Sequence, residues 1–275
     1  MNAQVDRPIG MFDSGFGGLT VARAIIDLLP SENLVYIGDT ARYPYGPKPA
    51  SDVRSFAIEL ATSLVRDFSV KLIVVACNTA ASVALTELQS LLSVPVIGVV
   101  EPGARALVRE TKNNRVAVIG TTGTIASGAY ENAVANASRE ITSEVTLTAT
   151  ACPGFVEFVE RDETSGAAVT ELAQKLLAPI RKADVDALLL GCTHYPYLSA
   201  VIGQVMGSGV KLINSADATA LVVRDALATN KTARSVDSGE RGSHEFYSSG
   251  DIKQFAEIGR RFLGPELSVA KQWPK

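Results

Sequence analysis

Apolar residues along the chain follow two alternating patterns. Short continuous aliphatic runs, typical of strands buried on both faces of a sheet, alternate with longer stretches whose apolar residues recur at helical spacing. Strands are predicted at residues 8–12, 34–38, 71–76, 95–100, 115–119, 145–150, 186–191 and 209–213. Helices are predicted at about residues 17–29, 51–68, 79–92, 103–111, 125–137, 167–182, 197–206 and 216–228. This repeated strand-then-helix order predicts an α/β fold with doubly wound parallel sheets.

The order of features occurs twice along the chain. Cys77 and Cys192 lie 115 residues apart in similar frames, each at the end of an aliphatic run. Three more pairs of segments correspond at similar separations: Ile9–Gly18 with Val118–Gly128, Tyr36–Thr40 with Thr148–Cys152, and Val99–Arg105 with Ile213–Thr219. We interpret the repeat as an internal duplication of one α/β unit.

A duplication of this kind predicts two pseudo-symmetric lobes. The first is expected to comprise residues 1–100 and 213–275, and the second residues 101–212. The more polar tail, 229–275, is expected to add a final strand and helix to the first lobe. Because ligands of open α/β sheets bind outside the carboxyl ends of the strands, the active site is expected in the cleft between the lobes.

Composition and charge exclude several classes of function. The chain has 275 residues, of which 47% are hydrophobic and 6% aromatic, and its formal net charge is −3. Its basic residues are scattered, so no nucleic-acid partner is expected. The polar start of the chain and the lack of a long apolar run predict neither a signal peptide nor a membrane span. With three cysteines, these features predict free thiols in a cytoplasmic protein.

The two matching cysteine frames are the strongest chemical signal. In each, a strand gives way to a helix at the cysteine, where the helix dipole and backbone N–H groups favour a thiolate. Such repeated placement is not needed for a core thiol, so Cys77 and Cys192 are candidates for chemistry, whereas Cys152 is expected to be a buried hydrophobe. His194, two residues after Cys192, is a candidate proton partner in a chain with only two histidines.

Other polar residues of the predicted strand ends leave alternatives open. Asp13 and Ser14 follow a strand, and they serve either as a helix N-cap or as groups aimed at a ligand. The turn 43–46 is either a plain Pro/Gly turn or a lid over the cleft. Hydroxyl and amide groups that could bind a small carboxylate also flank the strand ends, at Asn78, Thr79, Thr121, Thr122, Thr124 and Thr193.

Common cofactor motifs are missing from the sequence. The glycines at 15–18 do not have the dinucleotide-binding spacing, and no phosphate-binding loop of the Walker type is present. Two histidines and three separated cysteines do not form a metal-binding pattern. Lys48 and Lys71 have no special setting, so no pyridoxal lysine is evident. We therefore expect neither a metal nor a cofactor.

Seven motifs together resemble the glutamate racemase family. They run in order from about residue 8 to residue 215: FDSGFGG at 12–18, YIGDTARYPYG at 36–46, ACNTAAS at 76–82, VEP at 100–102, IGTTGT at 119–124, CPGFVEFVE at 152–160 and GCTHYP at 191–196. One departure is CPGFVEFVE, in which Gly154 and Glu157 replace an aliphatic residue and a proline of the usual pattern. The resemblance implies a cofactor-independent racemase, a homodimer, that makes D-glutamate for peptidoglycan.

The same resemblance implies roles for individual residues. Cys77 and Cys192 match the two groups that remove and deliver the α-proton. Asp13, Glu160 and His194 match the groups that assist them, although the departure at 154 and 157 weakens the case for Glu160. The residues that match the substrate-binding set are Asp13, Ser14, Tyr45, Gly46, Asn78, Thr79, Thr121, Thr193 and His194.

Three other functions compete with this interpretation. A racemase for aspartate or hydantoins would share both cysteines and the duplication, although the TTGT and CTHYP segments are closer to the glutamate branch. A two-lobed protein that binds small acids without chemistry would not need paired thiols. A Cys-His hydrolase would use one nucleophile and leave Cys77 without a role.

Overall fold

The computed structural model describes residues 4–235 and 241–274. Its internal contacts divide the chain into two compact units, Met1–Val99 with Ala216–Lys275, and Val100–Ser215. Residues 1–3, 236–240 and 275, which the predicted first lobe includes, lie outside the described residues. The predicted lobe limits, 1–100 with 213–275 and 101–212, stay a prediction.

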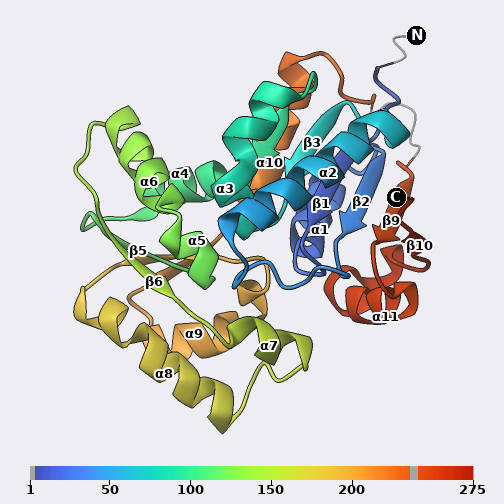
Figure 1. The fold of residues 1–275 in the computed structure, drawn as a ribbon. Coiled ribbons are helices and arrows are strands. Elements are labelled where there is room, and N and C mark those ends of the chain that lie inside the picture. The colour runs from blue at the N-terminus through green and yellow to red at the C-terminus, as the bar shows by residue number, and fades with distance from the viewer. Residues whose placement is uncertain (1–3, 236–240, 275) are drawn as a thin grey trace. The chain divides into compact units, whose positions relative to one another are not determined.

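The first unit contains a six-stranded, fully parallel sheet in the order β10-β9-β2-β1-β3-β4. Its strands are β1 (Ile9–Asp13), β2 (Leu34–Gly38), β3 (Leu72–Val75), β4 (Val96–Gly98), β9 (His244–Ser248) and β10 (Lys271–Gln272). In Figure 1 the red C-terminal strands lie beside the blue β2, because β9 pairs with β2 along its whole length. The predicted strand and helix in the tail are thus confirmed as β9 and α11.

The second unit contains a four-stranded parallel sheet in the order β6-β5-β7-β8. Its strands are β5 (Arg115–Gly120), β6 (Thr146–Ala151), β7 (Ala187–Gly191) and β8 (Lys211–Asn214). The first four strands of the first unit follow the equivalent order, β2-β1-β3-β4. The predicted α/β fold with two parallel sheets is therefore confirmed, and the strand orders correspond as a duplication requires.

Helices connect the strands in both units. In the first unit they are α1 (Leu19–Leu28), α2 (Ala50–Phe68), α3 (Asn78–Leu91), α10 (Ser215–Thr229, which starts at the last residue of the second unit), α11 (Ile252–Leu263) and the short η3 (Gly264–Glu266). In the second unit they are α4 (Val100–Glu110), α5 (Thr122–Ala126), α6 (Ala129–Glu140), α7 (Phe155–Glu160), α8 (Ala167–Lys182), η1 (Tyr195–Leu198) and α9 (Ser199–Met206).

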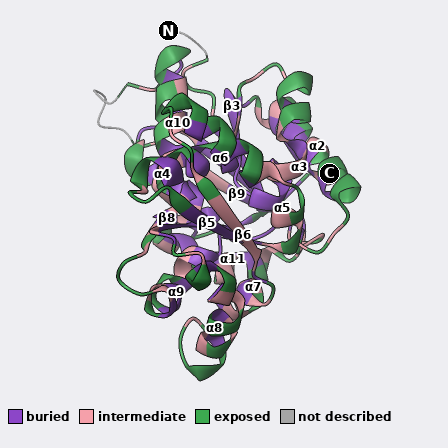
Figure 2. Ribbon diagram, turned by 90° about the vertical axis from the view of Figure 1, so that its left-hand side faces the viewer, coloured by how far each residue is buried: buried purple, intermediate pink, exposed green. Residues whose placement is uncertain are grey.

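The sheets form the core of each unit. Every residue of β1, β2, β3 and β7 is buried, as expected for parallel strands covered on both faces. Figure 2 shows the helices with buried and exposed faces. In α8 the buried residues Val169, Ala173, Leu177 and Ile180 recur every three or four positions and form one face.

Some element limits differ from those predicted. The predicted strand 95–100 ends at Gly98, and α4 begins at Val100, because apolar residues alone do not separate a strand end from a helix start. The predicted helix 125–137 is two helices, divided at Gly128, whose φ of 70° interrupts helical geometry. The short helix α7 was not predicted.

Lys71 corrects an expectation from the sequence. Rather than having no special setting, its side chain is 1% exposed and its Nζ lies 2.5 Å from Glu32 Oε2. Nζ also donates to the carbonyl oxygens of Val5 and Thr232, both at 2.8 Å. A lysine just before a strand carries no sequence signal for this role, because its partners come from distant segments.

No helix in the described ranges 4–235 and 241–274 is both long and apolar enough to cross a membrane.

Candidate active site

Cys77 lies where β3 ends and α3 begins. It is the N-cap of α3, and its Sγ accepts a hydrogen bond from the Ala80 N–H at 3.5 Å. Its Sγ is also 3.7 Å from Ser14 Oγ, and the residue is 5% exposed. The predicted position of this thiol, at a strand end and a helix start, is what the local structure shows.

Asp13 is the buried acid beside Cys77. It is the last residue of β1, is 1% exposed, and accepts a hydrogen bond from the Gly15 N–H at 2.7 Å through Oδ1. Burial, followed by the negative charge of Asp13, raises the pKa of the Cys77 thiol to about 12. The N–H of Ala80 and Ser14 lower this pKa but are outweighed, so the thiolate preference expected from the helix dipole alone does not hold at Cys77.

The alternative that Asp13 and Ser14 cap a helix is wrong. The N-cap of α1 is Gly18, which has no side-chain cap hydrogen bond. Gly18 is needed for close packing, because a Cβ there would lie 2.6 Å from the Asp13 Cβ and 2.8 Å from Tyr36 Oη. Tyr36 Oη donates to the Gly15 carbonyl at 3.2 Å, so the turn after β1 is held from two sides.

Three other predicted residues of the first unit, Asn78, Thr79 and Tyr45, are also buried. Asn78 and Thr79 open α3 and are 3% and 4% exposed. Tyr45 is 1% exposed, and its hydroxyl donates to the buried carboxylate of Asp39. Asp39 was not predicted, although it directly follows the predicted strand 34–38, as Asp13 follows the predicted strand 8–12, and this position offered a signal.

Cys192 lies at the equivalent place in the second unit, directly after β7. Its Sγ is 3.9 Å from His194 Nδ1, and His194 Nε2 is 3.3 Å from Glu160 Oε1. Glu160 is the last residue of α7, so the unpredicted helix is what carries it to the imidazole. Cys192, His194 and Glu160 thus form a continuous series of side chains within one unit.

The surroundings of His194 favour its protonated form. Its burial lowers the imidazole pKa, but the interactions with Cys192 and Glu160 outweigh burial and raise the pKa to about 10. An imidazolium beside a sulfur can give a proton to it or take one back. The two thiols therefore have opposite neighbours, an anion at Cys77 and a cation at Cys192.

Thr121 and Cys192 follow two neighbouring strands, β5 and β7. Gly120, the last residue of β5, pairs with Gly191, the last residue of β7, and Thr121 and Cys192 come directly after them. Thr121 is the N-cap of α5, where its Oγ1 accepts from the Thr124 N–H at 3.2 Å. Thr193 is 6% exposed, so it is largely buried like the thiol before it.

Cys152 is a core residue of the second unit, as predicted from the sequence. It is 1% exposed, and burial together with Cys192 raises the pKa of its thiol to about 12. Its carbonyl accepts a hydrogen bond from Tyr195 Oη at 2.9 Å, so its backbone helps to fix the residues after Cys192.

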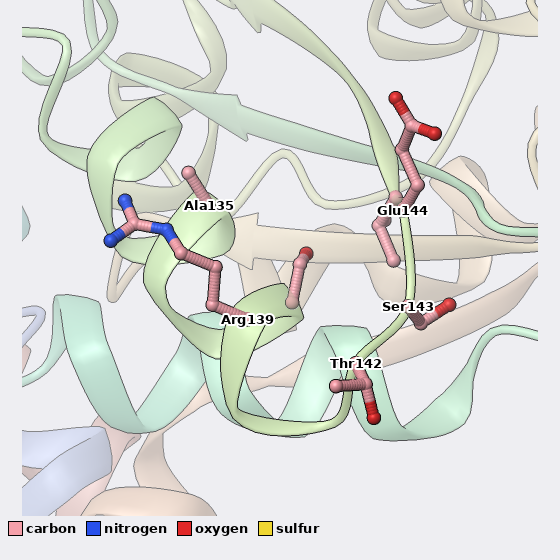
Figure 3. Close-up of a pocket in the computed structure, with 7 residues that line it drawn as sticks. Ala135, Arg139, Thr142, Ser143 and Glu144 are labelled. Carbon is pink, nitrogen blue, oxygen red and sulfur yellow. The ribbon is translucent and has the colours of Figure 1, made fainter.

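A hollow of about 430 Å³ on the second unit does not involve the predicted site residues. Figure 3 shows it between the end of α6 and the segment leading to β6, with Arg139 and Glu144 pointing apart. It is lined by Ala135, Ser138, Arg139, Thr142, Ser143, Glu144 and Val145. In the described part of the chain, no group of three or more His, Cys, Asp or Glu residues could hold a metal ion.

Comparison with known proteins gives concordant results. Residues 17–223 match the family model described as Asp/Glu/Hydantoin racemase. Proteins named glutamate racemase from Parafrankia sp. and Corynebacterium glutamicum are 49% and 48% identical over 97% of this chain, which covers 94% and 96% of their lengths.

Solved structures agree with these relatives. A glutamate racemase isoform from Bacillus anthracis superposes with a TM-score of 0.89 at 40% identity, covering 97% of both chains. A glutamate racemase from Francisella tularensis in complex with D-glutamate gives a TM-score of 0.89 at 32% identity, covering 98% of both chains. These matches define an enzyme of the isomerase class, an amino-acid racemase. The chain belongs to the Asp/Glu/Hydantoin racemase family.

Proposed function

We propose that the protein is a cofactor-independent glutamate racemase that interconverts L- and D-glutamate with two thiols. The main support is that Cys77 and Cys192 follow the third strand of each four-strand repeat, and each has an ionisable neighbour, Asp13 or His194. The names of relatives nearly half identical to this chain support glutamate as the substrate.

The proposed reaction is a proton exchange at Cα. A thiolate takes the α-proton, so the C–H bond breaks, an S–H bond forms, and the electron pair stays on a carbanion stabilised by the substrate carboxylate. The other cysteine gives its thiol proton to the opposite face of this carbon and becomes a thiolate. Atoms and charges balance, and inversion requires one thiol on each face.

The neighbours of the two thiols differ in charge. The high pKa of Cys77 means that it begins as a thiol and is ready to donate. At Cys192 the His194 imidazolium can stabilise and reprotonate the sulfur, and Glu160 orients the imidazole. Because the α-proton is a very weak acid, positioning and electrostatic stabilisation must supply much of the rate.

Substrate binding is proposed for the small polar groups around these thiols. Asp13, Ser14, Asn78 and Thr79 belong to the Cys77 side, and Thr121, Thr193 and His194 to the Cys192 side. Tyr45 and Gly46 complete the set. In the described chain, no group accepts a hydrogen bond from the backbone N–H of Tyr45 or Gly46, so these donors suit a substrate carboxylate.

The wider role is also proposed. D-Glutamate made in the cytoplasm by a homodimer of this chain would supply peptidoglycan synthesis. Sedimentation analysis of the purified protein tests the dimer, and depletion of the protein in its host, with rescue by added D-glutamate, tests the supply role.

The test of function uses purified protein freed of pyridoxal phosphate and metal, with L-glutamate in D₂O. Optical rotation and deuterium at Cα are followed together. Loss of rotation with deuterium gain for glutamate, but not for aspartate or a hydantoin, is expected. Activity on those other substrates alone would favour the sister racemases, and glutamate binding with neither signal would favour a binding protein.

A further inference from the structure

Asp39 is a fully buried carboxylate directly after β2, and both of its oxygens are hydrogen-bonded. Oδ1 accepts from Ser249 Oγ at 2.6 Å. Oδ2 accepts from Arg42 Nε at 2.6 Å and from the hydroxyl of Tyr45. The Asp39 backbone N–H donates to the Asp13 carbonyl at 2.9 Å, so this residue is also attached to the end of β1.

The groups around Asp39 compensate for its burial. Arg42 supplies the opposite charge and also pairs with Glu59, while its guanidinium lies 4.4 Å from the centre of the Phe56 ring. Burial and then Asp39 raise the pKa of the Tyr45 hydroxyl well above its ordinary range, so the hydroxyl stays a neutral donor. A buried carboxylate with this many partners holds each of them in a fixed geometry.

The segment after β9 is bound to the loop that Asp39 opens. Ser249 Oγ, besides donating to Asp39, accepts from the Ala41 N–H at 3.0 Å. Thr40 Oγ1 and Ser248 Oγ are 2.6 Å apart, and the Gly250 N–H donates to Thr40 Oγ1 at 3.1 Å. Residues that are more than 200 positions apart in the sequence therefore support the loop from Asp39 to Gly46.

We propose that Asp39 is a positioning residue that fixes the Tyr45–Gly46 backbone for substrate binding, and that Ser249 fixes Asp39. The inference rests on the proposed function, in which the Tyr45 and Gly46 N–H groups bind glutamate. The Tyr45 hydroxyl donates a hydrogen bond to Asp39, and the Tyr45 backbone carbonyl accepts one from the Lys48 N–H at 3.0 Å. The side chain and carbonyl of Tyr45 are thus both hydrogen-bonded within the protein, and the N–H groups of Tyr45 and Gly46 are left for the substrate.

The expected signature is weaker substrate binding without a matching loss of turnover. A loop that binds substrate and transition state alike changes KM with little change in kcat. Ser249→Ala and Tyr45→Phe are each expected to raise KM and the Kd for glutamate by about tenfold, the size of one lost charge-assisted hydrogen bond. Because both act through Asp39, the double variant should raise KM by less than the product of the two effects.

Controls separate positioning from general damage. Ser249→Thr keeps the hydroxyl and should return KM towards wild type. Tyr247→Phe removes another tyrosine–carboxylate hydrogen bond of the first unit, from Tyr247 Oη to Glu245 at 2.6 Å, and should leave KM unchanged. Thermal unfolding of each variant verifies that the protein is folded at the assay temperature.

Steady-state kinetics and glutamate calorimetry on the full chain together decide the outcome. Raised KM and Kd in Ser249→Ala, restored in Ser249→Thr, would support the proposal. Unchanged KM and Kd in both single variants, or a fall in kcat alone, would overturn it. If the wild type itself neither racemises nor binds glutamate, the proposed function fails instead. If it binds glutamate without racemising it, the Kd values of the variants still test the role of Asp39.

Discussion

At the scale of single residues, the two cysteines share a position but differ in their electrostatic surroundings. Cys77 is next to Asp13, and burial with that negative charge keeps it a thiol. Cys192 is next to the His194 imidazolium, which Glu160 also contacts. The same residue type thus stands beside a negative charge in one unit and beside a protonated imidazole in the other.

The first prediction concerns the thiols themselves. Cys77→Ser and Cys192→Ser should each lower racemisation by about 10²–10⁴-fold, because a hydroxyl is a poor replacement for a thiol in proton transfer. Optical rotation with L- and with D-glutamate measures the loss. Cys152→Ala is the matched control, since this buried cysteine has no role in the proposed proton transfer. Near-normal racemisation by either serine variant would rule out the two-thiol mechanism.

The second prediction concerns pH and His194. Its pKa is raised from 6.5 to about 10, so the folded protein binds a proton there that the unfolded chain has lost. This contribution to the free energy of unfolding is complete below pH 6.5 and disappears as the pH rises through about 10. Urea unfolding should therefore give a lower free energy of unfolding for the wild type at pH 9 than at pH 6. The difference between the two pH values should be smaller in His194→Gln.

His244→Gln is the control for this measurement. Burial lowers the pKa of His244, so its contribution to the free energy of unfolding increases with pH, opposite to that of His194. His244→Gln should therefore keep the decline in the free energy of unfolding from pH 6 to pH 9. An equal decline in His194→Gln and in the wild type would show that His194 is not protonated in the folded protein.

At the scale of elements, the strand ends bring the polar residues together. In the first unit, β1 and β3 are neighbours, so Asp13 and Cys77 meet at their carboxyl ends. In the second unit, β5 and β7 are neighbours in the same way, and Thr121 and Cys192 directly follow their last paired residues, Gly120 and Gly191. The close contact of α1 with β1 then depends on a small residue at Gly18.

The third prediction concerns that contact. Gly18→Ala should lower the free energy of unfolding by about 1–3 kcal/mol, because the added methyl meets Asp13, Tyr36 and Ala76. It should also lower racemisation, since Asp13 must move. Gly209→Ala is a matched control, because nothing lies within 4 Å of a Cβ there. Urea unfolding and optical rotation measure the two effects, and equal stability of both variants would contradict the packing argument.

At the scale of the whole chain, the polypeptide leaves the first unit after Val99 and returns to it at Ala216. The buried pair of Lys71 and Glu32 ties the returning segment to the rest of that unit. Lys71 Nζ donates to the Thr232 carbonyl, and Glu32 Oε1 accepts from the Arg234 N–H at 2.7 Å. The first unit is therefore held together by segments from both ends of the chain.

The fourth prediction concerns this pair. Glu32→Gln should lower the free energy of unfolding by about 3–5 kcal/mol, because it leaves the buried Lys71 charge without its carboxylate. The double variant Glu32→Leu with Lys71→Met should lose less free energy of unfolding than Glu32→Gln, since neither charge remains. Glu163→Gln, which alters an exposed ion pair with Arg161, is the control and should leave urea unfolding unchanged.

The sequence by itself was enough for features that are local or that repeat. Eight aliphatic runs predicted β1 to β8, and the matching cysteine frames located both thiols, because strand periodicity and strand-to-helix transitions are written in neighbouring residues. The limits of α4 and the division between α5 and α6 were missed, since apolar patterns do not mark where one element ends.

Only the tertiary structure decided the partners of buried charges. Glu160 reaches His194 through a helix that the pattern did not predict, and Asp39 is bound by Ser249, 210 positions along the chain. It also reversed the expected thiolate preference of Cys77, because burial and Asp13 outweigh the helix start. Desolvation and charge pairing depend on which distant segments meet, and no local pattern of residue types records that.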